Sequence, residues 1–205
     1  MTITRKLCEK IVATTVDDVG ESAIAKARQL VLDGIAVAVA GARIEEAPKI
    51  LANYLRGQES RPECSALGFG FRLAPAPAAL LNATSMHVLD FEPMWTPATH
   101  ALSPALAPAL MLAESIGTDG REVLAAVIKG IEIQGWIRRA SGHVESRDFK
   151  FHPPGMVGPV GAVVAASHLL KLDATALTNA IGIATSRCGS LTSNKIGRAS
   201  CRERV

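Results

Sequence analysis

Apolar residues recur at helical spacing along most of this chain. The clearest stripe advances in steps of three or four residues through Ile24, Ala27, Val31, Ile35 and Ala38. Residues at this spacing lie along one face of a helix. The stripe therefore predicts a long helix that ends near Gly41.

A shorter helix and a connector are expected next. The apolar face of this helix consists of Ile50, Leu51, Tyr54 and Leu55. Gly57 is its expected stop. Residues 58–77 are rich in proline and glycine, which is typical of a connector. Residues 79–89 then predict a helix that leads into the segment DFEPMWTPATH, residues 90–100.

Three later helices are marked by signals at their N-termini. Ser103 followed by Pro104 predicts an N-cap and a proline in the first helical position. Asp119 and Glu122 have the spacing of a capping box, and Asp173 is the expected cap of the last helix. The predicted fold class is therefore all-α.

A further helix, which follows the break SGHVESRDFKFHPPG, carries an unusually small face that permits close packing against its neighbours. Its members are Gly158, Gly161, Ala162, Ala165 and Ala166. The sequence contains no internal repeat, no dinucleotide or phosphate-binding glycine fingerprint, and no alternation of strands with helices. With 205 residues, 48% of them hydrophobic, the chain is long enough to bury a sizeable core as one domain.

The last residues change the interpretation of the charge. IGRASCRERV, residues 196–205, resembles the translation of a sequencing-library adapter, and Lys195 fits a codon completed by that adapter. We therefore expect a partial helical domain over residues 1–194 and a non-native tail over residues 195–205; a natural basic tail is the alternative. Without the tail's four basic residues and one acidic residue, the 22 basic and 19 acidic residues become 18 of each.

This balanced charge gives no support for binding of nucleic acid, since no basic stripe remains. The uncharged stretches are too short and too rich in proline to span a bilayer. Cys8, Cys64 and Cys188 are widely spaced, which favours reduced thiols and no zinc site. Because the N-terminus lacks the apolar run of an export signal, a cytoplasmic location is expected.

Two interruptions of the helical pattern place a histidine beside proline. TPATH contains His100, and FHPPG contains His152. Proline restricts the backbone of a loop, so it limits where a neighbouring side chain can point. Asp90 lies three residues after His87, close enough for its carboxylate to orient that imidazole. A surface or capping role is the alternative for each histidine.

Several segments together resemble the MmgE/PrpD family. They are NATSMHVLDFEPMWTPATH, SPALAPALMLAE, GIEIQGWI, FHPPGMVGPVGAVVAASHLLKLD and ALTNAIGIATSRCGSLTSN. The family includes 2-methylcitrate dehydratase, cis-aconitate decarboxylase and iminodisuccinate epimerase. The resemblance implies a large helical domain followed by a smaller α/β domain, which this chain would lack, and homodimers that use no metal or organic cofactor.

The resemblance also implies a site. Asp90, His100 and His152 match polar active-site positions and are the expected catalytic residues, converging in space. His87 and Trp95 are the expected substrate-binding residues. The implied substrate is a small di- or tricarboxylate, and the implied activity is that of a lyase, a dehydratase or decarboxylase. An isomerase or epimerase of the same family is the alternative.

The chain departs from the decarboxylase-like pattern at three positions. Met94 replaces a threonine, Pro93 replaces an acid, and Thr96 replaces a histidine. A thioether cannot donate a hydrogen bond as a hydroxyl does, so the reaction subtype is left open.

Two other classes of function also remain open. One is a non-catalytic helical interaction domain. The other is a metal-dependent hydrolase with Asp90, His100 and His152 as ligands. The family's active-site lysine would follow residue 194, so this chain alone is expected to be inert. The small face near Gly161 and Ala165 is expected to be exposed where later helices are missing.

The tail gives a first testable prediction. Deleting residues 195–205 should leave helix content and solubility unchanged, because an adapter-encoded segment was never selected to bury apolar surface. Far-ultraviolet circular dichroism and the soluble yield of both chains would check this. A clear loss of folded protein on deletion would show that the tail belongs to the fold.

Overall fold

The computed structural model describes residues 2–142 and 151–191, which form eight helices and two short hairpins. The helices are α1 (Ile3–Ala13), α2 (Glu21–Ile44), α3 (Glu46–Arg56), α4 (Pro75–His87), α5 (Leu102–Ile116), α6 (Gly120–Ala140), α7 (Pro153–Leu169) and α8 (Ala174–Thr185). The antiparallel hairpins pair β1 (Cys64–Ala66) with β2 (Phe71–Leu73) and β3 (Met94–Trp95) with β4 (Thr99–His100). The predicted helical fold class is confirmed.

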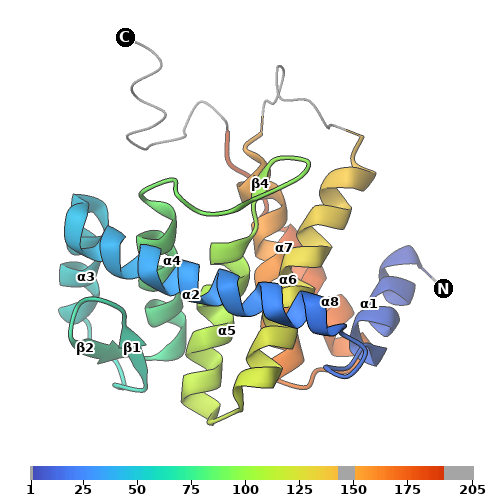
Figure 1. Ribbon diagram of the computed structural model, residues 1–205, viewed down its shortest axis with the longest axis horizontal. Coiled ribbons are helices and arrows are strands. Elements are labelled where there is room, and N and C mark those ends of the chain that lie inside the picture. The colour runs from blue at the N-terminus through green and yellow to red at the C-terminus, as the bar shows by residue number, and fades with distance from the viewer. Residues whose placement is uncertain (1, 143–150, 192–205) are drawn as a thin grey trace.

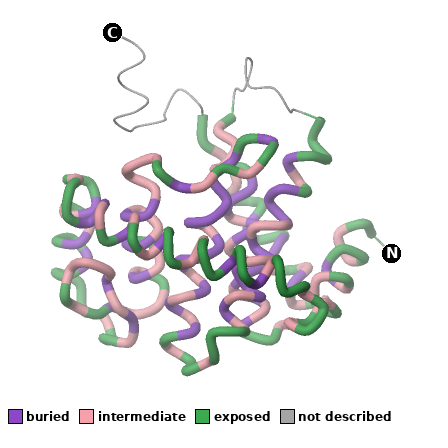
Figure 2. The backbone as a smooth tube through the Cα atoms, in the orientation of Figure 1, coloured by how far each residue is buried: buried purple, intermediate pink, exposed green. Residues whose placement is uncertain are grey.

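Helices α5, α6 and α7 lie side by side at the centre of the molecule, and α2 runs across α4, α5 and α6 (Figure 1). At one end α1 packs on α8. At the other end α3 and the β1–β2 hairpin pack on α4. The buried positions gather where these helices face one another, whereas the outer side of α2 is exposed (Figure 2). No helix in the two described ranges is long and apolar enough to cross a membrane.

Close approach of α5, α6 and α7 depends on glycine and alanine. A Cβ atom at Gly130 of α6 would lie 2.8 Å from the Ala105 Cβ of α5 and 3.1 Å from the Ala165 Cβ of α7. A Cβ at Gly161 would overlap the side chain of Gln134. The expected close packing of the small face is thus confirmed. The expectation that this face is exposed was wrong, because α5 and α6 cover Gly161 and Ala165.

Apolar side chains fill three clusters around this centre. The main cluster lies between α2, α4, α5, α6 and α7 and includes Leu102, Leu106 and Val127. A second cluster joins the β1–β2 hairpin to α3, α4 and α5 around Leu81. A third holds α1 against α6, α7 and α8 around Leu177. Leu81, Leu102, Leu106 and Leu177 are each almost fully buried, so every one of the three clusters has a dry centre.

Two of the predicted N-caps are confirmed and one was wrong. The Asp119 carboxylate accepts hydrogen bonds from the backbone of the first turn of α6, and Asp173 does the same for α8. Helix α5 begins at Leu102, one residue before Ser103. Ser103 therefore lies inside the first turn, where its own backbone N–H requires a partner.

Some predicted boundaries differ from the structure for physical reasons. Gly41 lies inside α2, which continues to Ile44. A side chain at Gly41 would overlap the backbone of Ser85, so this glycine permits α2 to approach α4. Helix α3 ends at Arg56 with Gly57 as its C-cap, as predicted, but Ile50 and Tyr54 are exposed.

The β3–β4 hairpin, which the sequence pattern did not predict, is held on α6 by an aromatic contact. The indole of Trp95 occupies the space beside Gly135, where a Cβ atom would overlap the ring. His100 is carried on the partner strand of the same hairpin. The position of His100 therefore depends on a glycine of α6.

We expect Gly135→Ala to lower the free energy of unfolding by about 1–3 kcal/mol, because overpacking displaces the indole. Thermal and denaturant unfolding would measure this change. Gly182→Ala in α8 is the matched control: Gly182 is also helical but has open space around it. That control should stabilise the chain by about 0.5–1 kcal/mol through helix propensity. Equal effects of the two substitutions would contradict the role of Gly135.

Candidate active site

The segment between α4 and α5 brings two acids and two histidines together within a short stretch of chain. His87 is the last residue of α4, and His100 lies on β4, two residues before α5 begins. Between them, Asp90 adopts a positive φ of 56°. Aspartate tolerates this left-handed conformation better than most residues. The segment that follows α4 runs over the bundle to the β3–β4 hairpin (Figure 1).

Asp90 and His100 form the first pair. The Asp90 Oδ1 atom lies 3.1 Å from His100 Nε2. His100 is buried, and its neighbour Thr99 is almost fully buried. A carboxylate at one imidazole nitrogen fixes the ring and stabilises its protonated form. The expected proximity of Asp90 and His100 is present in the structure.

His87 and Glu92 form the second pair. His87 Nδ1 lies 3.0 Å from Glu92 Oε2. This differs from the sequence-based expectation, in which Asp90 orients His87. Helical spacing suggested that pairing, but the chain leaves the helix after His87, and the turn at Asp90 points its carboxylate toward His100 instead.

Glu92 is the member of this cluster that the sequence did not single out. Its carboxylate accepts hydrogen bonds from the backbone N–H of Ser103 and, over 2.9 Å, from the Ser103 hydroxyl. Glu92 therefore caps α5 from a position 11 residues earlier in the chain. Standard cap signals are local, so no spacing rule would have identified Glu92.

Opposing effects determine the charge of Glu92. Burial, which leaves this residue only 5% exposed, favours the neutral acid. Hydrogen bonds from His87 and Ser103 favour the carboxylate and outweigh burial, so the pKa of Glu92 lies below its ordinary value. The charged form also suits the N-terminus of α5, where the helix dipole favours an anion.

The two pairs contact each other through their rings. The centroids of His87 and His100 are 5.0 Å apart with an interplanar angle of 78°. Donor atoms of His87, Glu92 and His100 all lie within 4.8 Å of one another, a set that could ligate a metal ion. The predicted metal-hydrolase ligands were instead Asp90, His100 and His152. Because both Glu92 oxygens already accept hydrogen bonds, a metal would have to displace them.

His152 approaches this region from another part of the chain. It is the N-cap residue of α7, and its backbone N–H donates to Ser190 O over 2.9 Å. Helix α7 packs against β4, the strand that carries His100. The convergence of the His152 side chain with Asp90 and His100 stays a prediction.

Trp95 and Met94 lie beside a separate cavity. This cavity of about 570 Å³ is bounded by α2, α6 and the β3 strand, and both residues line it. Asp90 and His100 are not among its lining residues in the described part of the chain. Trp95 thus packs the hairpin onto α6, and its predicted substrate contact stays a prediction. Met94, the Cα partner of His100 across the hairpin, is 58% exposed.

Comparison with known proteins places this geometry in context. The MmgE/PrpD N-terminal domain family matches residues 5–202. Cis-aconitate decarboxylase of Mus musculus is 30% identical over 197 residues, and that of Homo sapiens is 29% identical over 197 residues. A cis-aconitate decarboxylase-like protein, oryM of Aspergillus oryzae, is 26% identical over 200 residues.

These alignments cover most of this chain but less than half of each relative. They span 94%, 94% and 92% of the chain. The corresponding shares of the mouse, human and Aspergillus proteins are 40%, 41% and 41%. The predicted family resemblance is confirmed. Residues 195–205 lie outside the described residues, so their adapter origin stays a prediction.

Glu92→Gln gives a prediction for this site. Replacing the carboxylate should lower the free energy of unfolding by about 1.5–3 kcal/mol, the range for hydrogen bonds to a charged group. The loss should depend on pH. Because the folded-state pKa of Glu92 is lowered, its stabilisation is complete above the ordinary value of 4.5 and is lost as the pH falls through the folded-state value.

Urea unfolding at several pH values from 7 downward would test this. The difference between wild type and Glu92→Gln should be largest near neutral pH and shrink in acid. Glu59→Gln, at an exposed position in the connector, is the control and should change stability by less than about 0.5 kcal/mol. A pH-independent difference for Glu92→Gln would refute the ionised cap.

Proposed function

Because this chain belongs to the MmgE/PrpD family, we propose that it is part of a lyase that acts on a small di- or tricarboxylate without a cofactor. The substrate would resemble 2-methylcitrate or aconitate. The observation that carries this proposal is the pair of buried His100 and half-buried Asp90, whose Nε2 and Oδ1 atoms lie 3.1 Å apart before α5. The cis-aconitate decarboxylases among the relatives support a lyase over other classes of enzyme.

The chemistry requires a group that can hold and release a proton. Loss of carbon dioxide or of water from a polycarboxylate passes through a carbanion-like centre next to a carboxylate. An imidazole beside a carboxylate can supply or remove the proton at that centre. In this proposal His100 transfers the proton. Asp90 stabilises the imidazolium while His100 holds that proton.

Glu92 and His87 would assist this reaction by orienting groups around His100. Glu92 fixes the ring of His87, and the edge contact between the rings limits the movement of His100. His87 would contribute a hydrogen bond to a substrate carboxylate. His152 would complete the site from the start of α7, which packs against the strand that carries His100.

The charge of the substrate demands more cations than these histidines provide. The chain spans about 40% of the length of the curated relatives. We expect the active-site lysine implied by the family to come from the remainder of the full-length protein. Fixed positive charge would hold the substrate and balance the developing anion. Homodimer formation and a cytoplasmic location belong to the same proposal.

Met94 keeps the subtype of the reaction open. It stands opposite His100 in the hairpin register, and its thioether provides no hydrogen-bond donor. An isomerase, which returns the proton to a different carbon, could use the same pair, whereas an epimerase needs a second acid on the opposite face of the substrate. A non-catalytic helical module would retain the fold without any turnover.

The test compares the present chain with the full-length protein that contains it. Both are assayed for decarboxylation, dehydration and epimerisation of small polycarboxylates, with and without added chelator. We expect turnover by the full-length protein alone. Asp90→Asn or His100→Gln in that protein should lower kcat by about 100-fold or more, the typical contribution of a positioned acid–base group.

Glu59→Gln, far from the pair in sequence and exposed, is the matched control and should keep full activity. Full-length protein without turnover on any of these acids would favour the non-catalytic module. Loss of activity with chelator would favour the metal-dependent alternative. Turnover by the present chain alone would show that the missing lysine is not required.

A further inference from the structure

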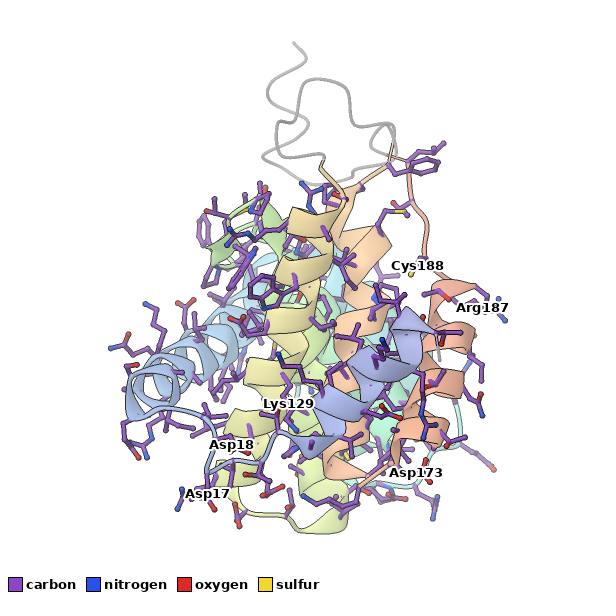
Figure 3. All side chains as sticks on the ribbon, turned by 90° about the vertical axis from the view of Figure 1, so that its right-hand side faces the viewer. Asp17, Asp18, Lys129, Asp173, Arg187 and Cys188 are labelled. Atoms are coloured by element: carbon purple, nitrogen blue, oxygen red, sulfur yellow. The ribbon has the colours of Figure 1, made fainter. Side chains whose placement is uncertain are left out.

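A second cluster of titratable groups, around the buried Lys129, lies at the opposite end of the bundle from Asp90 and His100. The end of α1 and the following segment, the first turns of α6 and the end of α7 enclose a cavity of about 450 Å³. Figure 3 shows Lys129 and Asp18 on the side of the molecule where α1 lies. A cavity of this size can hold a small organic molecule.

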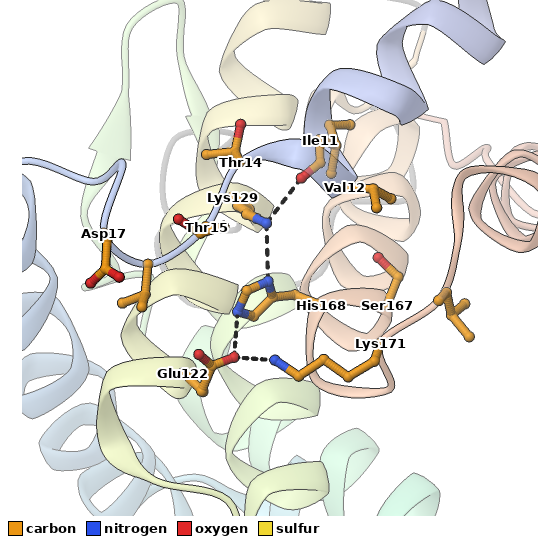
Figure 4. Close-up of a pocket in the computed structure, with 12 residues that line it drawn as sticks. Ile11, Val12, Thr14, Thr15, Asp17, Glu122, Lys129, Ser167, His168 and Lys171 are labelled. Atoms are coloured by element: carbon orange, nitrogen blue, oxygen red, sulfur yellow. Dashed lines mark hydrogen bonds and ion pairs between the residues drawn. The ribbon is translucent and has the colours of Figure 1, made fainter.

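Lys129 is the central group of this cavity (Figure 4). Its Nζ atom donates to the backbone oxygen of Ile11 over 2.9 Å and lies 3.0 Å from His168 Nδ1. On the far side of the ring, His168 Nε2 lies 3.0 Å from Glu122 Oε2. Lys171 pairs with the same Glu122 oxygen.

Donor and acceptor chemistry assigns the protons in this chain of contacts. An ammonium group only donates, so His168 Nδ1 must accept from Lys129. The imidazole is therefore neutral with its proton on Nε2, directed at Glu122. A proton that leaves Lys129 has a neutral imidazole 3.0 Å away to receive it, and Glu122 is placed to stabilise the resulting imidazolium.

The surroundings favour loss of that proton. Burial lowers the pKa of Lys129, and so does the positive charge of Lys171. The negative charges of Glu122 and Asp18 raise it, but the net shift is downward. Burial also lowers the pKa of His168, with the charge of Lys129 as the next cause, which keeps the ring neutral. Asp17 is the other charged residue that lines the cavity, at its exposed rim.

We propose that Lys129 is the amine of a covalent site for small carbonyl compounds, which it binds as a Schiff base with His168 as the proton carrier. The carbonyl compound is an aldehyde or an α-keto acid. Thr14 and Thr15 line the same cavity, and because their hydroxyls donate to Lys10 O and Asp18 Oδ2, their oxygens are left to accept a hydrogen bond. This site is independent of the lyase site proposed above.

The reaction balances without any further reactant. The Lys129 ammonium gives a proton to His168 Nδ1, and the free amine attacks the carbonyl carbon, forming a C–N bond while the carbonyl electron pair moves to oxygen. Proton transfer from nitrogen to oxygen gives a neutral carbinolamine. The imidazolium then protonates the hydroxyl, which leaves as water as the C=N bond forms.

The product suits the cavity better than an amide would. A protonated imine keeps the positive charge that Glu122 and Asp18 face, and it keeps one N–H for the oxygen of Ile11. Acylation of Lys129 would remove the positive charge that Glu122 and Asp18 favour. The electrostatics therefore favour reversible condensation with a carbonyl over acyl transfer.

Reductive trapping tests the proposal on the chain as it is. The protein is incubated at neutral pH with cyanoborohydride and either propanal or pyruvate, and the label on each lysine is measured by peptide mass spectrometry. Lys129 should be labelled several-fold faster than Lys49, an exposed lysine paired with Glu46 on α3. A higher ratio of Lys129 to Lys49 labelling with propanal identifies aldehydes as the ligand class, and a higher ratio with pyruvate identifies keto acids.

Variants show whether fast labelling of Lys129 depends on proton transfer by His168 or only on the exposure of the amine. His168→Gln can still accept a hydrogen bond but cannot carry the proton, so labelling of Lys129 should slow by about 100-fold while Lys49 is unchanged. Lys129→Arg keeps the charge and should abolish the label at this position. If His168→Gln does not fold, Glu122→Gln, which removes the carboxylate facing the imidazolium, should also slow labelling. Labelling of Lys129 no faster than that of Lys49, or unaffected by these substitutions, would overturn the proposal.

Discussion

The carboxylate of Glu92 ties together the two ends of the loop that carries the candidate active site. Removing a charged acid from water is costly unless its oxygens are satisfied. Here one side chain receives hydrogen bonds from the end of α4, through His87, and from the start of α5, through Ser103. The same contacts fix the two ends of the loop. Asp90 must therefore turn within a closed segment, which brings its carboxylate to His100.

Packing provides the second constraint on this loop. The β3–β4 hairpin rests on α6 because Gly135 leaves room for the indole of Trp95. Helix α6 in turn is held against α5 and α7 by contacts around Gly130 and Gly161 that no larger residue would permit. Interiors at native density transmit small displacements. A change in helix spacing would thus alter the position of His100.

The parts of this structure that follow local rules could be predicted from the sequence. Asp119 and Asp173 cap their helices because the side chain bonds to amides two or three residues ahead. The cap of α5 could not be predicted in this way, since Glu92 lies 11 residues before Ser103. Likewise, helical periodicity predicts that Asp90 contacts His87. The chain turns at Asp90, where φ is positive, and its carboxylate lies beside His100 instead. The Asp90–His100 pair was expected only from family resemblance.

The second cluster escaped prediction for a related reason. No spacing rule brings Lys129 and His168 together, because the members of this cluster come from α1, α6, α7 and the turn after α7. Both clusters nevertheless follow one physical rule. Each places a glutamate within the first turn, or at the N-terminus, of a central helix, where the dipole favours its charge, and each uses that glutamate to hold a histidine. Because α5 and α6 run in opposite directions, the two glutamates lie at opposite ends of the bundle. One antiparallel helix pair thereby supports two separate acid–histidine pairs.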